Sequence, residues 1–161
     1  MQIVGVDFLH NVTYVLANKE FSNQDLYLLS RVPTIKFLEV RNTQITSDGL
    51  KHLSRLNDLQ ATMLEGTEID DDGLKYLACH TKLAWLFLDS TNVTDDGLVC
   101  LKDLTGSLDS LRLSNTHITD AGVEHLKQFK KLKVLDVNGT DISPAGMKEL
   151  TTALSGTVVI P

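Results

Sequence analysis

A pattern of about 24 residues recurs along this 161-residue chain and limits the folds that it can adopt. Successive threonines of the pattern, Thr43, Thr67, Thr91, Thr116 and Thr140, are separated by 24, 24, 25 and 24 residues. Two further columns keep the same spacing: Gly49, Gly73, Gly97, Gly122 and Gly146, and Ile45, Ile69, Val93, Ile118 and Ile142. A fixed period of this length indicates a solenoid, in which each repeat forms one coil stacked on the next.

Each repeat is predicted to contain a strand, a turn and a short helix. Leu86 and Leu88 alternate with other residues, as in a strand that buries one face. Thr94 then suits the N-cap of a helix, because its hydroxyl can accept from the free N–H groups of the first turn. Leu98 and Leu101 follow at helical spacing and would pack against the strand layer. The glycine column is expected to let each helix start lie close to the neighbouring coil.

The consensus LxxLxLxxTxITDxGLxxLxxL resembles the leucine-rich repeat family over about residues 11–161. It is most similar to the bacterial variant that has threonine where many members have asparagine, and it is also similar to the repeats of F-box proteins. The resemblance implies an α/β fold, a right-handed solenoid with a parallel β-sheet on its concave face and short helices on its convex face. It says little about function, because one fold serves many functions.

The repeats predict a single domain over residues 1–161, with a cap at each end. Residues 1–33 are predicted to form an N-terminal cap with a degenerate first repeat, since terminal repeats cover the core with a more polar edge. In that repeat Tyr14 and Leu16 are expected to face the core, and residues 2–9 to add a strand. Residues 34–154 form five regular repeats, and residues 155–161 resemble a closing strand.

Composition narrows the classes of partner. The formal net charge of −6 argues against a nucleic acid, which needs clustered positive charge. No apolar run approaches the roughly 20 residues of a membrane helix, so we expect no membrane contact. The N-terminus lacks the features of a secretion signal, and Cys79 and Cys100 are too few for a disulfide framework. A reducing, cytoplasmic location is therefore predicted, with export as the alternative if a signal precedes Met1 in a longer gene product.

We find no motif for catalysis, for a cofactor or for a metal, and we predict a protein that is not an enzyme. One alternative concerns Asp71, Asp95 and Asp120, which occupy equivalent positions and should stack roughly 5 Å apart. Such a ridge could hold calcium through its carboxylate oxygens. We favour a simpler interpretation, in which each acid stabilises the start of its own helix through the helix dipole.

The residues between the core leucines of each strand should point to the concave face. Across the repeats they place an apolar group beside charged residues, and the predicted partner-binding residues are Phe37, Glu39, Arg41, Met63, Glu65, Trp85, Phe87, Asp89 and Arg112. In the first repeat the same face is expected to carry Thr13, Val15 and Ala17. An aromatic centre inside a charged rim is typical of a protein-binding hot spot.

The leading prediction is therefore a non-enzymatic module that binds another protein through its concave sheet. One alternative is a tail or scaffold domain of a larger secreted or surface bacterial protein. A second is a substrate adaptor of the ubiquitin-ligase type, which would require F-box helices that the sequence does not contain. The chain is expected to be a monomer, with self-association through the aromatic patch as the alternative.

Overall fold

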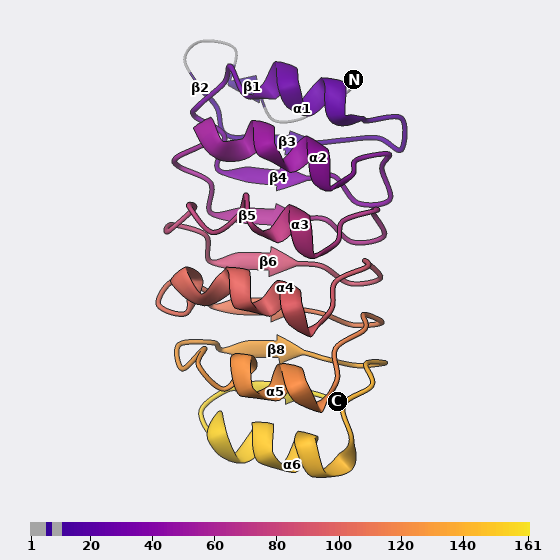
Figure 1. The fold of residues 1–161 in the computed structure, drawn as a ribbon. Helices are drawn as coiled ribbons and strands as arrows, with labels where there is room; N and C mark the ends of the chain where they lie inside the picture. Colours follow the sequence, from indigo (N-terminus) through magenta and orange to yellow (C-terminus); the bar gives the residue numbers. More distant parts are fainter. Residues whose placement is uncertain (1–5, 8–10) are drawn as a thin grey trace.

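The computed structural model describes residues 6–7 and 11–161. Strands and short helices alternate from one end of the molecule to the other (Figure 1). The strands are β1 Val6–Asp7, β2 Asn11–Val12, β3 Tyr14–Leu16, β4 Phe37–Glu39, β5 Ala61–Met63, β6 Trp85–Phe87, β7 Ser110–Arg112, β8 Val134–Asp136 and β9 Val158–Ile160. The helices are α1 Asn23–Leu29, α2 Ser47–Leu50, α3 Asp71–Leu74, α4 Asp95–Cys100, α5 Asp120–Leu126 and α6 Pro144–Ala153, with 3-10 helices η1 Lys51–Arg55 and η2 Leu101–Leu104.

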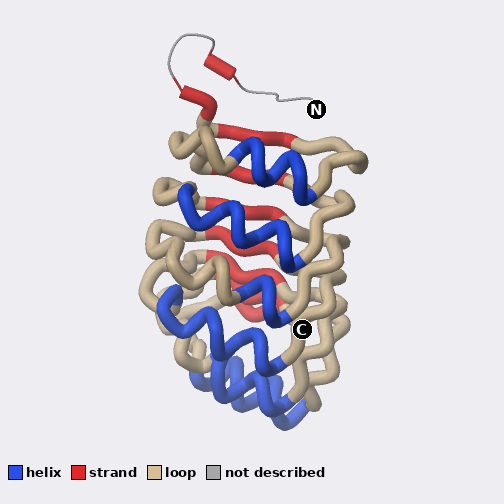
Figure 2. The backbone as a smooth tube through the Cα atoms, turned by 45° about the horizontal axis from the view of Figure 1, so that its top comes forward, coloured by secondary structure: helices blue, strands red, loops and turns tan. Residues whose placement is uncertain are grey.

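Strands β3 to β9 form one sheet in chain order, and each neighbouring pair is parallel. The helices lie together on the other side of the solenoid (Figures 1 and 2). This arrangement confirms the predicted α/β solenoid. Strands β1 and β2 form a separate antiparallel pair, and the rest of the strand predicted over residues 2–9 lies outside the described residues.

The core is a stack of aliphatic side chains between the sheet and the helices. The middle residue of each strand from β3 to β8 faces it, and all six are almost completely buried: Val15, Leu38, Thr62, Leu86, Leu111 and Leu135. Burying apolar surface in this way contributes about 25 cal/mol per Å². Thr62 is the polar member of the column, and its buried hydroxyl has no hydrogen-bond partner among the described residues.

The first repeat differs from the prediction by one residue. Tyr14 pairs with Phe37 and Leu16 pairs with Glu39, so both residues share the exposed face, while Val15 is buried at 1% exposure. The prediction that Tyr14 and Leu16 face the core was therefore wrong, as was the placement of Val15 on the concave face. The step from the first repeat to the second is 23 residues, from Tyr14 to Phe37, and a slip of one residue exchanges the two faces of a strand.

The helices are short, and the longest, α6, has 10 residues. Across the described part of the chain, none combines the length and apolar character that crossing a bilayer would require. Cys79 and Cys100 are both free thiols.

Candidate binding surface on the concave sheet

The exposed face of the sheet carries a continuous aromatic cluster. Phe37 and Trp85 occupy the same column of the sheet on β4 and β6, with Ala61 of β5 between them. Strands two apart are separated by roughly 9.5 Å, yet the two rings stack with centroids 6.3 Å apart. The rings must therefore lean toward each other across the small Ala61 side chain, which is only 1% exposed. A larger residue at position 61 would separate them.

Tyr14 extends this cluster toward the N-terminal edge. Its ring lies 6.2 Å from that of Phe37, and its hydroxyl donates to Glu39 Oε2 over 2.6 Å. Because the carboxylate accepts this proton, the pKa of the Tyr14 hydroxyl is raised and the group stays protonated. Tyr14 is the member of the surface that sequence reasoning missed. The signal that could have found it is an aromatic residue 23 positions before Phe37, one short of the regular period.

Trp85 is the most exposed aromatic side chain of the cluster, at 39%. Met63 and Phe87 lie beside it in the next column of the sheet, and both are half-buried. The Arg112 guanidinium covers the ring of Phe87, with its central carbon 5.3 Å from the ring centroid. The apolar cluster is thus open at Trp85 and closed by a cation at Phe87.

Charged residues form the second half of the surface, and each arginine lies between two carboxylates. Arg41 Nε is 3.2 Å from Glu39 Oε1 and 3.3 Å from Glu65 Oε1, and Arg41 Nη2 also donates to the sulfur of Met63 over 3.0 Å.

Arg112 Nε is 3.2 Å from Asp89 Oδ2 and 3.7 Å from Asp136 Oδ2. The backbone N–H of Ser114 donates to the other oxygen of Asp89 over 3.2 Å. These ion pairs hold the guanidinium of Arg112 over the ring of Phe87 and that of Arg41 against the sulfur of Met63.

Glu65 is not fully balanced by these contacts. Its Oε2 atom is buried without a hydrogen-bond partner in the described part of the chain. Burial raises the pKa of this carboxyl, and the neighbouring Asp89 adds to the rise while Arg41 and Arg112 oppose it. The four carboxylates of the surface also outnumber its two arginines, so the surface has an excess of negative charge.

The structure brings the predicted residues together on one face. Six of them lie within strands β4 to β7: Phe37, Glu39, Met63, Trp85, Phe87 and Arg112. The other three, Arg41, Glu65 and Asp89, come two residues after the ends of β4, β5 and β6. Arg41 pairs with Glu39 and Glu65, and Asp89 pairs with Arg112.

The stacked aspartates lie in the first turns of their own helices, as predicted, and have a further structural role that the prediction did not contain. Asp71 is the first residue of α3, and it serves the next coil, where the backbone N–H of Thr94 donates to its Oδ1 over 2.8 Å and the Thr94 hydroxyl donates to its Oδ2 over 2.6 Å. Asp95 makes the same contacts with Thr119, and Asp120 with Ser143. Thr94 itself caps α4 as predicted, because its side chain accepts from Asp96 N–H.

The contacts of these aspartates with the next coil explain why glycine recurs at the helix starts. A Cβ atom at Gly97 would lie 2.3 Å from Asp71 Oδ1, closer than any non-bonded contact allows. The close packing of each helix start against its neighbour is thereby explained by a side chain of the preceding coil. The carboxylate oxygens are already used as acceptors, and the described residues contain no group of three potential metal ligands from histidine, cysteine, aspartate and glutamate.

Known proteins match both the repeats and the fold. The family model of the leucine-rich repeat matches residues 107–127 and 130–150. Internalin C2 from Listeria monocytogenes has 25% sequence identity and a TM-score of 0.70, covering 84% of this chain and 54% of its own structure. The fold of this chain is therefore that of a leucine-rich-repeat solenoid, and both matches support the family resemblance seen in the sequence.

Two further solved structures share the leucine-rich-repeat fold at lower identity. A Listeria monocytogenes internalin F structure is 18% identical with a TM-score of 0.58, covering 82% of this chain and 42% of its own length. A leucine-rich-repeat protein of Leptospira interrogans is 22% identical with a TM-score of 0.65, covering 83% and 33% respectively. The chain therefore spans about half or less of each of these structures. No curated protein gives a significant sequence match to it.

Proposed function

We propose that this leucine-rich-repeat protein is a non-catalytic module that binds a partner protein on the concave face of its sheet. The observation that carries the proposal is the stacked pair of Phe37 and Trp85, which is held in place across Ala61 and leaves Trp85 open to solvent. Large aromatic side chains fixed before binding supply contact area at little cost in conformational entropy. Leucine-rich-repeat folds serve in general as interaction modules, which supports the proposal.

The rim of the surface suggests the chemistry of the partner. Arg41 and Arg112 are each held between two carboxylates, so the rim is ordered before a partner arrives. Its excess of carboxylates favours a partner segment that presents a lysine or arginine beside an apolar residue. Complementary charge of this kind acts mainly on the rate of association and on specificity.

Three predictions accompany the proposal, on the larger protein that could contain this module, on its cellular location and on its oligomeric state. The bacterial proteins of similar fold, which are longer than this chain, support the alternative that the module belongs to a larger bacterial protein. The free thiols of Cys79 and Cys100 are compatible with the predicted reducing location. A monomer remains the expected state, and sedimentation at increasing concentration would detect self-association through Trp85.

The test is a capture experiment with matched variants. Trp85→Ala/Phe87→Ala removes the centre of the surface, whereas Tyr76→Ala/Val99→Ala removes two exposed apolar residues from the helical side. A partner captured by the wild type and by the second variant should be lost by the first. Once the partner is identified, calorimetry should show that the Trp85→Ala/Phe87→Ala variant loses about 2 kcal/mol or more of binding free energy.

Retention of every partner by the Trp85→Ala/Phe87→Ala variant would place recognition on another surface. The melting temperature of each variant serves as the control for folding, because surface substitutions change stability by only about 0.5 kcal/mol.

A further inference from the structure

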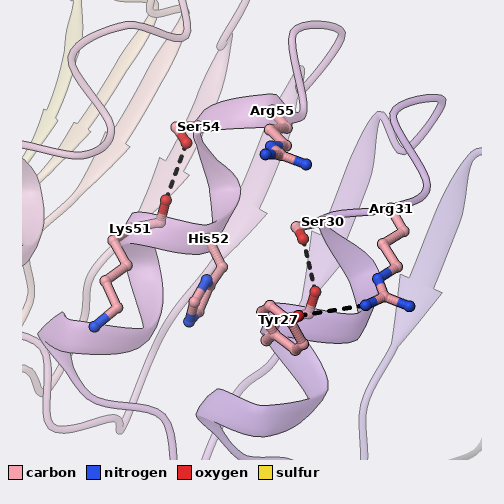
Figure 3. Close-up of a pocket in the computed structure, with 7 residues that line it drawn as sticks. All are labelled: Tyr27, Ser30, Arg31, Lys51, His52, Ser54 and Arg55. Atoms are coloured by element: carbon pink, nitrogen blue, oxygen red, sulfur yellow. Dashed lines mark hydrogen bonds between the residues drawn. The ribbon is translucent and has the colours of Figure 1, made fainter.

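A basic groove lies on the helical side of the first two repeats, away from the sheet. Its volume is about 240 Å³, and Figure 3 shows the residues that line it, Tyr27, Ser30, Arg31, Lys51, His52, Ser54 and Arg55. They come from α1 and the residues that follow it, and from η1. Three of the seven carry a permanent positive charge, and none carries a negative one.

The repeat itself brings the two arginines together. The sequence Leu-Ser-Arg occurs at residues 29–31 and again at residues 53–55, one period later. Arg31 and Arg55 therefore occupy equivalent positions on neighbouring coils, whose packed helices lie roughly 8–10 Å apart. The next repeat has Ala78 and Cys79 at the corresponding positions, which confines the doubled pair to this groove.

Tyr27 organises one wall of the groove. The guanidinium of Arg31 lies over its ring, 5.4 Å from the centroid, and Arg31 Nη2 donates to the Tyr27 hydroxyl over 3.3 Å. The imidazole of His52 meets the same ring edge-on at a centroid distance of 5.3 Å. One aromatic side chain thus positions two nitrogen-bearing groups that line the same space.

Negative charge is nearly missing from this region. In the part of the chain that the structure describes, Arg31 and Arg55 form no ion pair with any carboxylate. Among the described residues, the one carboxylate that forms an ion pair with a cation of the groove is Asp48, which is 3.8 Å from Lys51 Nζ and whose side chain is 82% exposed. Neighbouring like charges repel, and an anion between them would remove that repulsion.

We propose that this groove binds a phosphate-type dianion, either free or carried as a phosphate monoester. Arg31 and Arg55 would supply paired N–H donors to its oxygens, since the planar guanidinium matches phosphate geometry. Lys51 would add a third positive charge, and His52 a ring nitrogen. The site is separate from the concave surface and independent of the function proposed for it.

The test is a titration of the full chain with inorganic phosphate, at constant ionic strength maintained with chloride. Two-dimensional ¹H–¹⁵N spectra should show saturable shifts of the amide signals of residues 27–31 and 51–55. Arg31→Gln/Arg55→Gln should weaken phosphate binding about tenfold or more, because charge-assisted hydrogen bonds are lost. The control Lys102→Gln/Lys148→Gln removes the same charge from exposed sites elsewhere on the helical side and should bind as the wild type does.

A second titration with phosphoserine, using serine as its control, identifies the form of the ligand. Saturable shifts with phosphoserine would assign the groove to phosphate monoesters, and shifts with inorganic phosphate alone would assign it to the free ion. Both results support the site. Failure of phosphate to produce saturable shifts in the wild type would overturn the proposal, as would equal affinity in the Arg31→Gln/Arg55→Gln variant.

Discussion

Arginine has opposite surroundings on the two sides of this solenoid. On the sheet, Arg41 and Arg112 each lie between two carboxylates, which for Arg112 come from the two neighbouring coils and for Arg41 from its own coil and the next. On the helical side, Arg31 and Arg55 line the same groove, and the described residues form no ion pair with either. The backbone repeat is the same in both places, so the difference comes from the side chains that the repeat brings into each column.

This comparison separates charge that orders the molecule from charge that is available to a ligand. A guanidinium that two carboxylates already hold has most of its attraction satisfied within the chain. A pair of guanidinium groups without carboxylates has unsatisfied attraction and mutual repulsion, and both favour an anion from outside. Under the two proposals above, the concave face would recognise its partner through aromatic area, and the groove would recognise its ligand through charge.

The largest predicted effect concerns the layer behind the concave face. Leu86→Ala should lower the free energy of unfolding by about 2–5 kcal/mol, because it leaves a cavity in the core where Leu86 is fully buried. Trp85→Ala, one position away on the exposed face, should change it far less. Urea denaturation of both variants measures the contrast. Equal losses would mean that the aromatic cluster is part of the core and not a recognition surface.

The next largest effect is the loss of stability at acidic pH that the buried side chain of His80 causes. His80 is 2% exposed, neither ring nitrogen has a hydrogen-bond partner of good geometry in the described chain, and burial lowers its pKa, an effect that the Leu56 carbonyl only partly offsets. The unfolded state therefore binds the proton more readily, and stability is lost as the pH falls through the ordinary histidine value of 6.5 toward the lowered one.

Replacing His80 with leucine, the residue found one repeat earlier and one repeat later, should raise stability by about 1–3 kcal/mol at neutral pH. It should also remove the loss of stability below about pH 6.5. Thermal denaturation at several pH values provides the measurement. An unchanged acid response would assign that response to other groups.

A matched pair of arginine variants tests the comparison itself. Arg112→Gln leaves Asp89 and Asp136 without their cation and should lower stability by about 0.5–1 kcal/mol. Arg55→Gln removes only repulsion and should leave stability unchanged or slightly raised at low salt. Denaturation at low and high salt measures both, and a similar loss in the two variants would remove the distinction between the two sides.

The smallest effect belongs to Glu65, the carboxylate that the concave arginines do not fully balance. Its pKa is raised in the folded state, so the folded protein takes up this proton before the unfolded chain does as the pH falls toward the ordinary value of 4.5. This group therefore adds stability on acidification, with the sign opposite to that of His80. Glutamine resembles the protonated carboxyl, so the Glu65→Gln variant should have a higher free energy of unfolding than the wild type at neutral pH. Urea denaturation at several pH values should show this difference shrinking toward pH 4.5.

The sequence allowed the fold to be predicted because every coil repeats the same buried positions. The columns of leucine, threonine and glycine recur at fixed spacing, and a solenoid is the structure in which they stack. The prediction failed at Tyr14 and Leu16, where one residue is missing from the period and the regular repeats could not set the register. It placed Asp71 and its equivalents correctly at the starts of their own helices and missed their hydrogen bonds to the next coil, because spacing alone cannot tell which coil a side chain reaches.

The sequence was enough to predict which residues lie on the concave surface, but it did not predict how their side chains are arranged. Alternation along the strands is enough to place Phe37, Trp85 and Arg112 on one face. The lean of two rings across Ala61 and the pairing of each arginine with two carboxylates depend on side-chain rotamers that the pattern does not contain. The basic groove was missed although its signal, the repeated Leu-Ser-Arg, is visible in the sequence. A tripeptide that occurs in two successive repeats matches no known ligand-binding motif, so a search for such motifs does not find it.

The most direct test of the contrast between the two sides is the effect of phosphate on thermal stability. A ligand that binds only the folded state raises the melting temperature. At equal ionic strength, phosphate in place of chloride should raise the melting temperature of the wild type and of the Arg41→Gln/Arg112→Gln variant by more than that of Arg31→Gln/Arg55→Gln, which should show only the general stabilisation that phosphate gives to folded proteins. Equal stabilisation of both variants, or none in the wild type, would contradict the account.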